Sequence, residues 1–192
     1  ELIAERGFWA GLNTSFKFPC RFAAYTLVAN GVYPHELDIR LPFSLVSNNA
    51  DQTELQIMPA YWFLYNMYGL KRNEWKYSRR DRRRNPLQPV EYDALAPDTV
   101  ESIFEAMAIL ELWMGRHVLA HEGRDNGPEN QDHLRLLGFQ QLMKNQTGLI
   151  DLQVPAKQIE NSQRPVRILK GVEAYHMYRD MIRHYAVKTL VE

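Results

Sequence analysis

The chain has 192 residues, of which 45% are hydrophobic and 24% charged, and its formal net charge at pH 7 is zero. This length predicts one domain or little more, and this composition excludes an intrinsically disordered chain. The single cysteine, Cys20, excludes an intrachain disulfide, and no apolar run reaches the roughly 18 residues of a transmembrane helix.

Residues 1–50 favour strands and turns, because short apolar runs alternate with Gly and Pro. Small or apolar residues recur here at intervals of six, a period typical of the interior of a left-handed parallel β-helix. Irregular strands packed on helices would explain the same pattern nearly as well. We therefore predict a strand-and-turn segment over 1–50, as the last coils of a β-helix or as irregular strands, followed by a helical domain over 51–192. The recurring residues are Ala4, Ala10, Phe16, Phe22 and Val28.

The stretch from Pro59 to Arg84 is predicted to be one long helix. Tyr61, Tyr65 and Tyr68 follow helical spacing, and other large apolar residues fill most of the remaining circumference of the first half. A helix that is apolar nearly all round is a central helix, so we expect the rest of the chain to pack around this half.

The second half of this stretch is strongly basic, with eight Lys or Arg and two acidic residues between positions 71 and 84. Arginine binds phosphate and carboxylate groups through two parallel hydrogen bonds, and Trp75 and Tyr77 could stack on bases. A solvated helix end, or pairing with acidic residues elsewhere in the chain, would explain the charges equally well. The candidate anion-binding residues are Lys76, Arg79, Arg80, Arg82, Arg83 and Arg84.

Three further helices are predicted from apolar stripes at helical spacing. The second helix begins at a capping box formed by Asp98 and Glu101 and ends at Gly123, the third spans 133–144, and the fourth runs from about residue 172 to the end. The predicted fold class is therefore mainly α: a bundle of about four helices with a short irregular or β-helix-like segment at the N-terminus.

A pair of histidines lies near the end of the second helix. His117 and His121 are four residues apart, so both rings face the same side of the helix and could share a metal ion. No third ligand is identifiable from the sequence. Histidines also occur near helix C-termini because the helix dipole favours a positive charge there.

Three segments carry a resemblance to a known family: RFAAYTLVANGVYPHELDIRLPFSLVSNN, LQIMPAYWFLYNMYGLKRNEWKYSRRDRR and EYDALAPDTVES. They resemble a family of large uncharacterised bacterial proteins in which a left-handed β-helix of hexapeptide repeats leads into a helical C-terminal region. Members are often labelled sugar-nucleotide pyrophosphorylases or hexapeptide acyltransferases. The resemblance implies a parent nucleotidyltransferase or acyltransferase whose catalytic residues lie upstream, since this chain has neither a G-x-G-x-x-G nor a G-x-x-x-x-G-K-[ST] motif.

Three functions follow from these observations. The first is a non-catalytic C-terminal module of a sugar-nucleotide β-helix protein, with a capping or oligomerisation role. The second is an enzyme domain that binds a phosphorylated or nucleotide-linked sugar through the Arg-rich helix end, and the third is a nucleic-acid-binding module.

The expected partners follow from the ends and the composition of the chain. It starts without Met and stops within a helical pattern, which we interpret as a segment of a longer protein. We therefore expect the remainder of the parent chain as a partner, along with a second copy of the chain, or a sugar phosphate or nucleotide. With no signal peptide, we expect a cytoplasmic location, no membrane contact and no cofactor.

Overall fold

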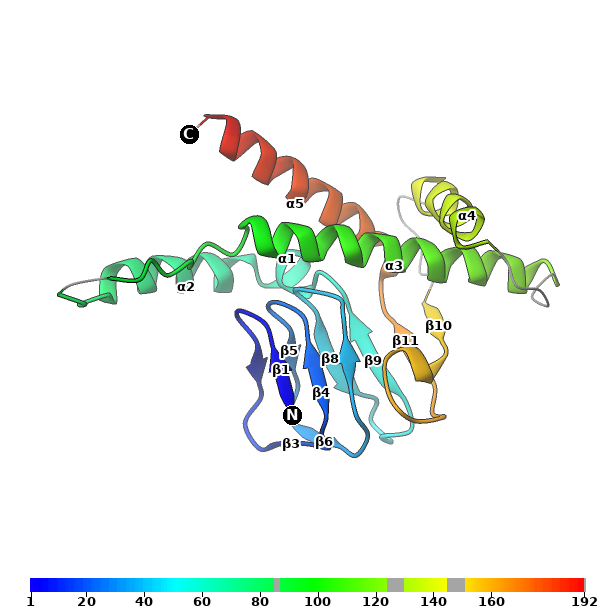
Figure 1. Ribbon diagram of the computed structural model, residues 1–192. Coiled ribbons are helices and arrows are strands. Elements are labelled where there is room, and N and C mark those ends of the chain that lie inside the picture. The colour runs from blue at the N-terminus through cyan, green and yellow to red at the C-terminus, as the bar shows by residue number, and fades with distance from the viewer. Residues whose placement is uncertain (85–86, 124–129, 145–150, 192) are drawn as a thin grey trace.

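The computed structural model describes residues 1–84, 87–123, 130–144 and 151–191. Short strands occupy the first third of the chain and helices most of the rest (Figure 1). The strands are β1 (Leu2–Ala4), β2 (Trp9–Ala10), β3 (Thr14–Phe16), β4 (Cys20–Phe22), β5 (Leu27–Val28), β6 (Gly31–Tyr33), β7 (Asp38–Ile39), β8 (Leu45–Asn48), β9 (Leu55–Met58), β10 (Leu152–Val154) and β11 (Val166–Ile168).

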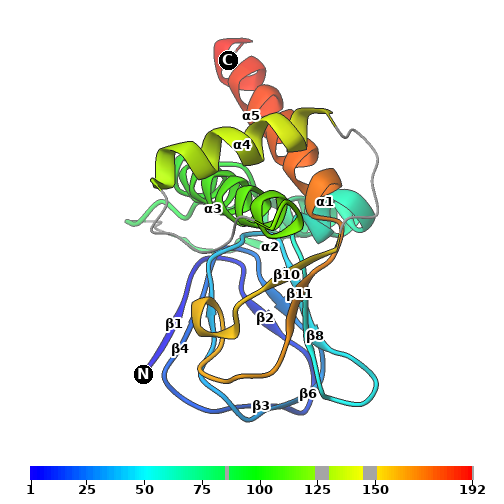
Figure 2. The same cartoon turned by 90° about the vertical axis from the view of Figure 1, so that its right-hand side faces the viewer.

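The first eight strands wind around a three-sided body, whose section is seen in Figure 2. The chain visits three sheets in turn, so that parallel strands from successive circuits lie side by side. In the first sheet, for example, Leu2 of β1 lies beside Cys20 of β4, and Arg21 of β4 lies beside Asp38 of β7. The five residues at six-residue intervals each end one of the strands β1 to β5.

The largest sheet shows that the predicted fold class is wrong. It has six strands in the order β10-β11-β9-β8-β5-β2, and it is mixed, because β8–β9 and β10–β11 are antiparallel pairs. The protein is therefore an α/β protein, with three sheets in the part of the chain that the structure describes, and neither a mainly α bundle nor a regular β-helix of hexapeptide repeats describes it. This sheet takes strands from both sides of residue 50.

The helices lie along one side of the strand body (Figure 1). The second, third and fourth predicted helices correspond to α3, α4 and α5. A 3-10 turn, η1, follows β10. The helices are α1 (Tyr61–Tyr65), α2 (Met67–Arg80), α3 (Pro97–His121), α4 (Gln131–Lys144) and α5 (Gly171–Val191), with η1 at Ala156–Gln158.

The predicted long helix over 59–84 is wrong in two respects. Its backbone breaks at Asn66, where φ is −138°, so that α1 and α2 are separate helices. Its tyrosines are not the spine of the core, since Tyr65 is 53% exposed and Tyr68 is 78% exposed. The central helix is instead α3, which runs above the strand body for most of its length.

One corner of the strand body holds the helices. Tyr25 and Phe43 occupy equivalent corners of successive circuits with positive φ, and their rings stack at 4.8 Å. Gly7 occupies the same corner one circuit earlier, where a Cβ atom would lie 2.5 Å from the Tyr25 ring. Phe63 of α1 continues the stack, at 4.2 Å from the Phe43 ring. The aromatic corner is thus the point where strands and helices share one core.

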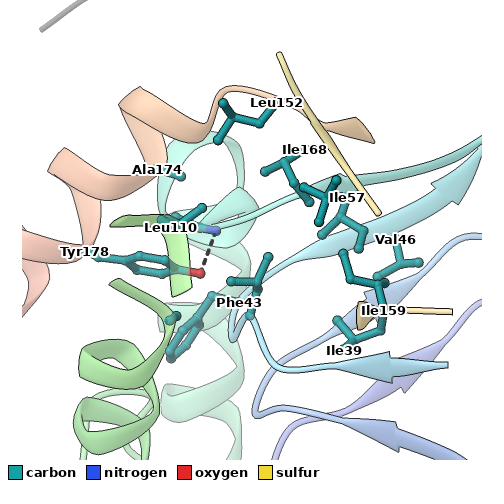
Figure 3. Close-up of a cluster of buried hydrophobic side chains, with 14 of the residues drawn as sticks. Ile39, Phe43, Val46, Ile57, Leu110, Leu152, Ile159, Ile168, Ala174 and Tyr178 are labelled. Atoms are coloured by element: carbon teal, nitrogen blue, oxygen red, sulfur yellow. Dashed lines mark hydrogen bonds between the residues drawn. The ribbon is translucent and has the colours of Figure 1, made fainter. Parts of the chain in front are cut away.

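Tyr178 of α5 closes this corner from above (Figure 3). Its buried hydroxyl donates a hydrogen bond to the Pro42 carbonyl at 2.5 Å and accepts one from the Ala60 N–H at 3.2 Å. Burial raises the pKa of this hydroxyl, so it remains a donor. Both partners are turn residues whose backbone groups would otherwise be buried without a bond.

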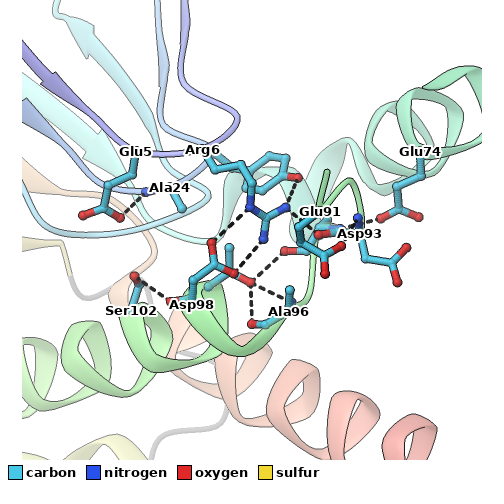
Figure 4. Close-up of polar contacts among 12 residues, drawn as sticks. Glu5, Arg6, Ala24, Glu74, Glu91, Asp93, Ala96, Asp98 and Ser102 are labelled. Carbon is cyan, nitrogen blue, oxygen red and sulfur yellow. Dashed lines mark hydrogen bonds and ion pairs between the residues drawn. The ribbon is translucent and has the colours of Figure 1, made fainter. Parts of the chain in front are cut away.

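A polar cluster at the start of α3 fastens this helix to the first circuit (Figure 4). The Arg6 guanidinium donates to both carboxylate oxygens of Asp98, at 2.8 and 3.0 Å, and to the Tyr25 hydroxyl at 3.0 Å. The side chain of Arg6 holds the pKa of Asp98 below its usual range. The predicted capping box of Asp98 is therefore wrong: Thr99 caps α3 through the Ala96 backbone, and Asp98 binds Arg6.

Helices α3 and α4 cross at two glycines. A Cβ atom on Gly138 would lie 1.8 Å from the Glu111 carbonyl oxygen, and one on Gly115 would lie 2.1 Å from the Leu134 carbonyl oxygen. Both obstacles are helix backbone, which cannot rotate aside as a side chain can. The two helices therefore approach each other as closely as backbone atoms permit.

We predict that Gly138→Ala destabilises the protein by about 1–3 kcal/mol, because the added methyl group forces the two helices apart. Helix propensity alone would give the opposite sign, since Ala is favoured over Gly by about 1 kcal/mol in a helix interior. Urea unfolding followed by circular dichroism measures the change. The exposed Gln140→Ala on the same helix is the matched control, and stabilisation by Gly138→Ala would contradict the close crossing.

Candidate functional site

The basic segment lies on α2 and the residues that follow it, and α2 extends sideways beyond the strand body (Figure 1). The inner side of α2 is held by residues 92–94, because Tyr77 stacks on Tyr92 at 5.1 Å and Glu74 accepts a hydrogen bond from the Ala94 N–H at 2.9 Å. The outer side faces solvent, with Trp75 57% exposed.

Two of the predicted anion-binding arginines already have partners within the segment. Arg83 donates to both carboxylate oxygens of Asp81, at 2.7 to 3.0 Å, and to the Gln88 carbonyl at 2.9 Å. These bonds hold the pKa of Asp81 below its usual range. The Arg79 guanidinium lies over the Trp75 ring, 4.9 Å from its centroid. Arg83 thus fixes the turn after α2, and Arg79 keeps its charge exposed.

The other cations of α2 form an unneutralised row. Arg72, Lys76 and Arg80 follow one another at intervals of four residues, so they share one face. The charge of Arg72, then desolvation and the charge of Arg80, lower the pKa of Lys76. Among the described residues, the ion pairs of the segment stay within it, as Lys71–Glu74 and Asp81–Arg83. No acidic residue that the structure describes elsewhere in the chain forms an ion pair with this face. The other two predicted residues, Arg82 and Arg84, are exposed beyond the end of α2.

A cleft of about 710 Å³ lies between the C-terminal half of α3 and the edge of the six-stranded sheet. One wall is a single face of α3, and the other is formed by β10, η1 and β11. The six residues that give the cleft its character are Trp113, Arg116, His117, His121, Val154 and Arg167.

The predicted histidine pair lines this cleft. The rings of His117 and His121 meet edge to face, with their centroids 4.5 Å apart. Burial and, secondly, the neighbouring His121 lower the pKa of His117, so its ring is neutral at pH 7. In the described ranges, no group of three or more His, Cys, Asp and Glu could hold a metal ion. The metal site therefore stays a prediction, with two ligands brought together and no third one.

Sequence reasoning missed the rest of the cleft. Arg116 precedes His117 on α3, and Arg167 is the middle residue of β11, whose neighbours Val166 and Ile168 are buried. In a strand, the residue between two buried ones points to the opposite face, so the sequence V-R-I predicts an outward Arg167. That prediction requires the three-residue strand to be recognised first. Nothing local indicates that β11 lies below α3.

These features define an α/β protein with a three-sided strand body, helices along one corner, an exposed basic helix and one polar cleft. The model of a protein family described as domain of unknown function (DUF4954) matches residues 1–113, which is more than half of the chain. The chain therefore belongs to the DUF4954 family.

A relative from Treponema pallidum (strain Nichols), described as an uncharacterized protein, is 41% identical over 191 residues. The match covers 100% of this chain and 25% of the relative, so the chain spans about a quarter of that protein's length. No solved structure matches. Across the residues that the structure describes, no helix combines the length and apolar character needed to cross a membrane.

The comparisons correct the expected resemblance. The matching family is DUF4954, and neither a hexapeptide-repeat family nor a sugar-nucleotide enzyme was found. The six-residue rhythm misled because it arises from short strands at the three sides of this body, without a hexapeptide-repeat family behind it.

We predict that His117 makes the protein sensitive to acid. Because the pKa of His117 is lowered in the folded state, the unfolded chain takes up this proton first as pH falls. Stability therefore begins to fall as pH drops below the unfolded value of about 6.5, and the loss continues until pH passes the lower pKa of the folded state. His117→Gln should lose less stability than the wild type between pH 7.5 and pH 5, as measured by urea midpoints. The exposed His133→Gln is the control, and parallel curves for His117→Gln and wild type would refute the assignment.

Proposed function

We propose that this chain is a non-catalytic structural module that closes one end of a strand body within a longer protein. The observation that carries the proposal is a difference between the two ends of the three-sided body. At one end, later parts of the chain cover the sheet edges. At the other end, no strand among the described residues pairs with the outer edges of β1, β2 and β3.

The closed end is sealed by residues 155–168. The Asp38 N–H donates to the Ile159 carbonyl at 2.8 Å and the Asn161 N–H to the Glu36 carbonyl at 3.0 Å, so this segment pairs with the edge of β7. Arg164 then donates two hydrogen bonds, both 2.7 Å long, to the buried carboxylate of Glu160. A charged pair held this way fixes the segment in one position. Further strands could not pair with β7 without displacing it.

The open end offers backbone groups and apolar side chains together. The N–H groups of Glu5 and Trp9 bond inward to β4 and β5, so the alternation of a strand points those of Leu2, Ala4 and Ala10 outward. Large apolar side chains are exposed beside them: Ile3 is 49% exposed, Trp9 55% and Leu12 91%. An uncovered edge of this kind is a surface for pairing with another strand.

The size of the Treponema pallidum relative agrees with this proposal, since that protein is about four times as long as the matched segment. The occupant of the open edge would then be another part of the same longer protein. A cytoplasmic location is part of the proposal, supported by the single cysteine and the absence of a bilayer-crossing helix among the described residues.

We predict a difference in amide hydrogen exchange between this chain alone and the longer protein. In the isolated chain, the N–H groups of Leu2, Ala4 and Ala10 should exchange at rates near those of unstructured peptides, while Glu5 and Trp9 are protected. In the longer protein, the first three should slow by at least about tenfold, because a paired amide exchanges only when its strand opens. Mass spectrometry of short N-terminal peptides, or NMR, measures both states.

The internal control is the closed end, where the amides of Asp38 and Asn161 should be protected equally in both forms. If Leu2, Ala4 and Ala10 exchange as fast in the longer protein as in the isolated chain, the open edge has no strand partner and the proposal is wrong.

A second candidate function is carried by the unneutralised row on α2, which supports binding of a phosphorylated or nucleotide-linked sugar. We predict that a nucleoside diphosphate sugar binds at this face and that Arg72→Ala with Arg80→Ala weakens binding at least about tenfold, because each charge-assisted hydrogen bond contributes about 1.5–3 kcal/mol. Calorimetric titration measures the affinity for the nucleoside diphosphate sugar, and the exposed Lys157→Ala is the control variant. Binding of single-stranded nucleic acid that falls steeply with salt would favour the nucleic-acid alternative instead.

A further inference from the structure

The cleft between α3 and the sheet edge combines apolar and positively charged side chains, and the proposed structural role uses neither. Its walls include the Trp113 ring, Val154 and Pro155, which are apolar, and they also carry Arg116 and Arg167. Its volume of about 710 Å³ lies in the range of small-molecule sites, which is about 300–1,000 Å³.

The two arginines of the cleft differ in how far acidic side chains compensate their charge. Asp151, the acidic side chain among the described residues of the lining, lies 3.9 Å from the Arg167 guanidinium, which also contacts Glu54 at 3.0 Å. Arg167 is therefore largely compensated. Arg116 makes no ion pair or hydrogen bond with any described residue, so one full positive charge in the cleft has no partner there.

The histidines extend this positive side without adding a fixed charge. His117 and His121 lie one helical turn apart on α3, and both line the cleft together with Arg116. A neutral imidazole can donate one hydrogen bond to an anion, and a nearby anion favours uptake of a proton from solvent, which makes that hydrogen bond stronger. Three donor side chains of α3 thus face one side of the cleft.

The apolar side is fixed by its own hydrogen bond. The Trp113 indole N–H donates to the Gln158 side-chain oxygen at 2.6 Å, which joins α3 to η1 across the base of the cleft. Because the donor of this indole is occupied, the ring offers apolar surface to a ligand and nothing polar. Pro155 and Val154 continue that surface on the opposite wall.

We propose that this cleft binds a small organic anion with a flat apolar ring, its carboxylate or phosphate group on Arg116 and the histidines, and its ring between Trp113 and Pro155. A ring without an anionic group would leave Arg116 unpaired. An anion without a ring would leave the apolar surface of Trp113 and Pro155 exposed to water. The cleft therefore selects molecules that carry both groups.

The test uses four matched probes with the 192-residue chain: 2-naphthoate, 2-naphthyl phosphate, 2-naphthol and inorganic phosphate. At least one of the first two should bind in calorimetric titration, at least tenfold more tightly than both of the last two. The relative affinities of 2-naphthoate and 2-naphthyl phosphate tell whether the cleft prefers a carboxylate or a phosphate. Arg116→Gln should weaken binding at least tenfold, whereas the exposed Arg183→Gln on α5, which lies outside the cleft, should leave binding unchanged.

An NMR titration of the histidine ring signals gives a second readout that does not depend on the variant. The bound anion should raise the pKa of His117, and the exposed His133 should not respond. Equal binding by Arg116→Gln and wild type, equal binding of inorganic phosphate and 2-naphthyl phosphate, or no binding of either ring anion would each overturn the proposal.

Discussion

The contact between Tyr178 and the aromatic corner holds the two halves of this protein together. The strand body has no helix of its own, and its turns at Pro42 and Ala60 carry backbone groups that water cannot reach. One hydroxyl from the last helix satisfies both. The ring of Tyr178 is fully buried in the same core as Phe43 and Phe63, so burial and hydrogen bonding act together in this side chain. Without α5 this corner would expose both an apolar stack and unpaired backbone groups.

The elements that sequence reasoning found are those with long periodic patterns. Helix α3 keeps an apolar stripe over seven turns, and its buried residues, such as Ile103 and Leu110, stand at helical spacing. Strands were expected over residues 1–50, but the individual strands could not be placed, because none of those in the described ranges exceeds four residues, which is too short for an alternating pattern to stand out. The fold class was wrong mainly through β10 and β11, which lie in a stretch of mixed composition. The break at Asn66 has no Pro or Gly at that position to mark it.

The candidate sites differ in the same way: some are formed within one helix, and one is formed by segments far apart in the sequence. The basic row on α2 and the pair of His117 with His121 are local features of one helix, so spacing alone placed their members together. The cleft depends on Arg167, which comes to α3 only because β11 pairs in parallel with β9. That pairing joins segments more than a hundred residues apart in the chain, and no local pattern encodes it. The open edge of β1 likewise becomes visible only in three dimensions.

The alignment of corners also constrains how such a chain could change its length over evolution. Gly7, Tyr25 and Phe43 meet because each circuit brings the chain back to the same corner. An insertion of one or two residues inside a strand would move the rings that follow out of the stack, whereas a turn can absorb a single residue: the pairing offset is 18 residues for Leu27 with Leu45 and 17 for Arg21 with Asp38. Insertions should therefore be accepted as whole circuits, or at the outer turns away from the helices. A family built on this body would vary in length by discrete steps while its helical side stayed constant.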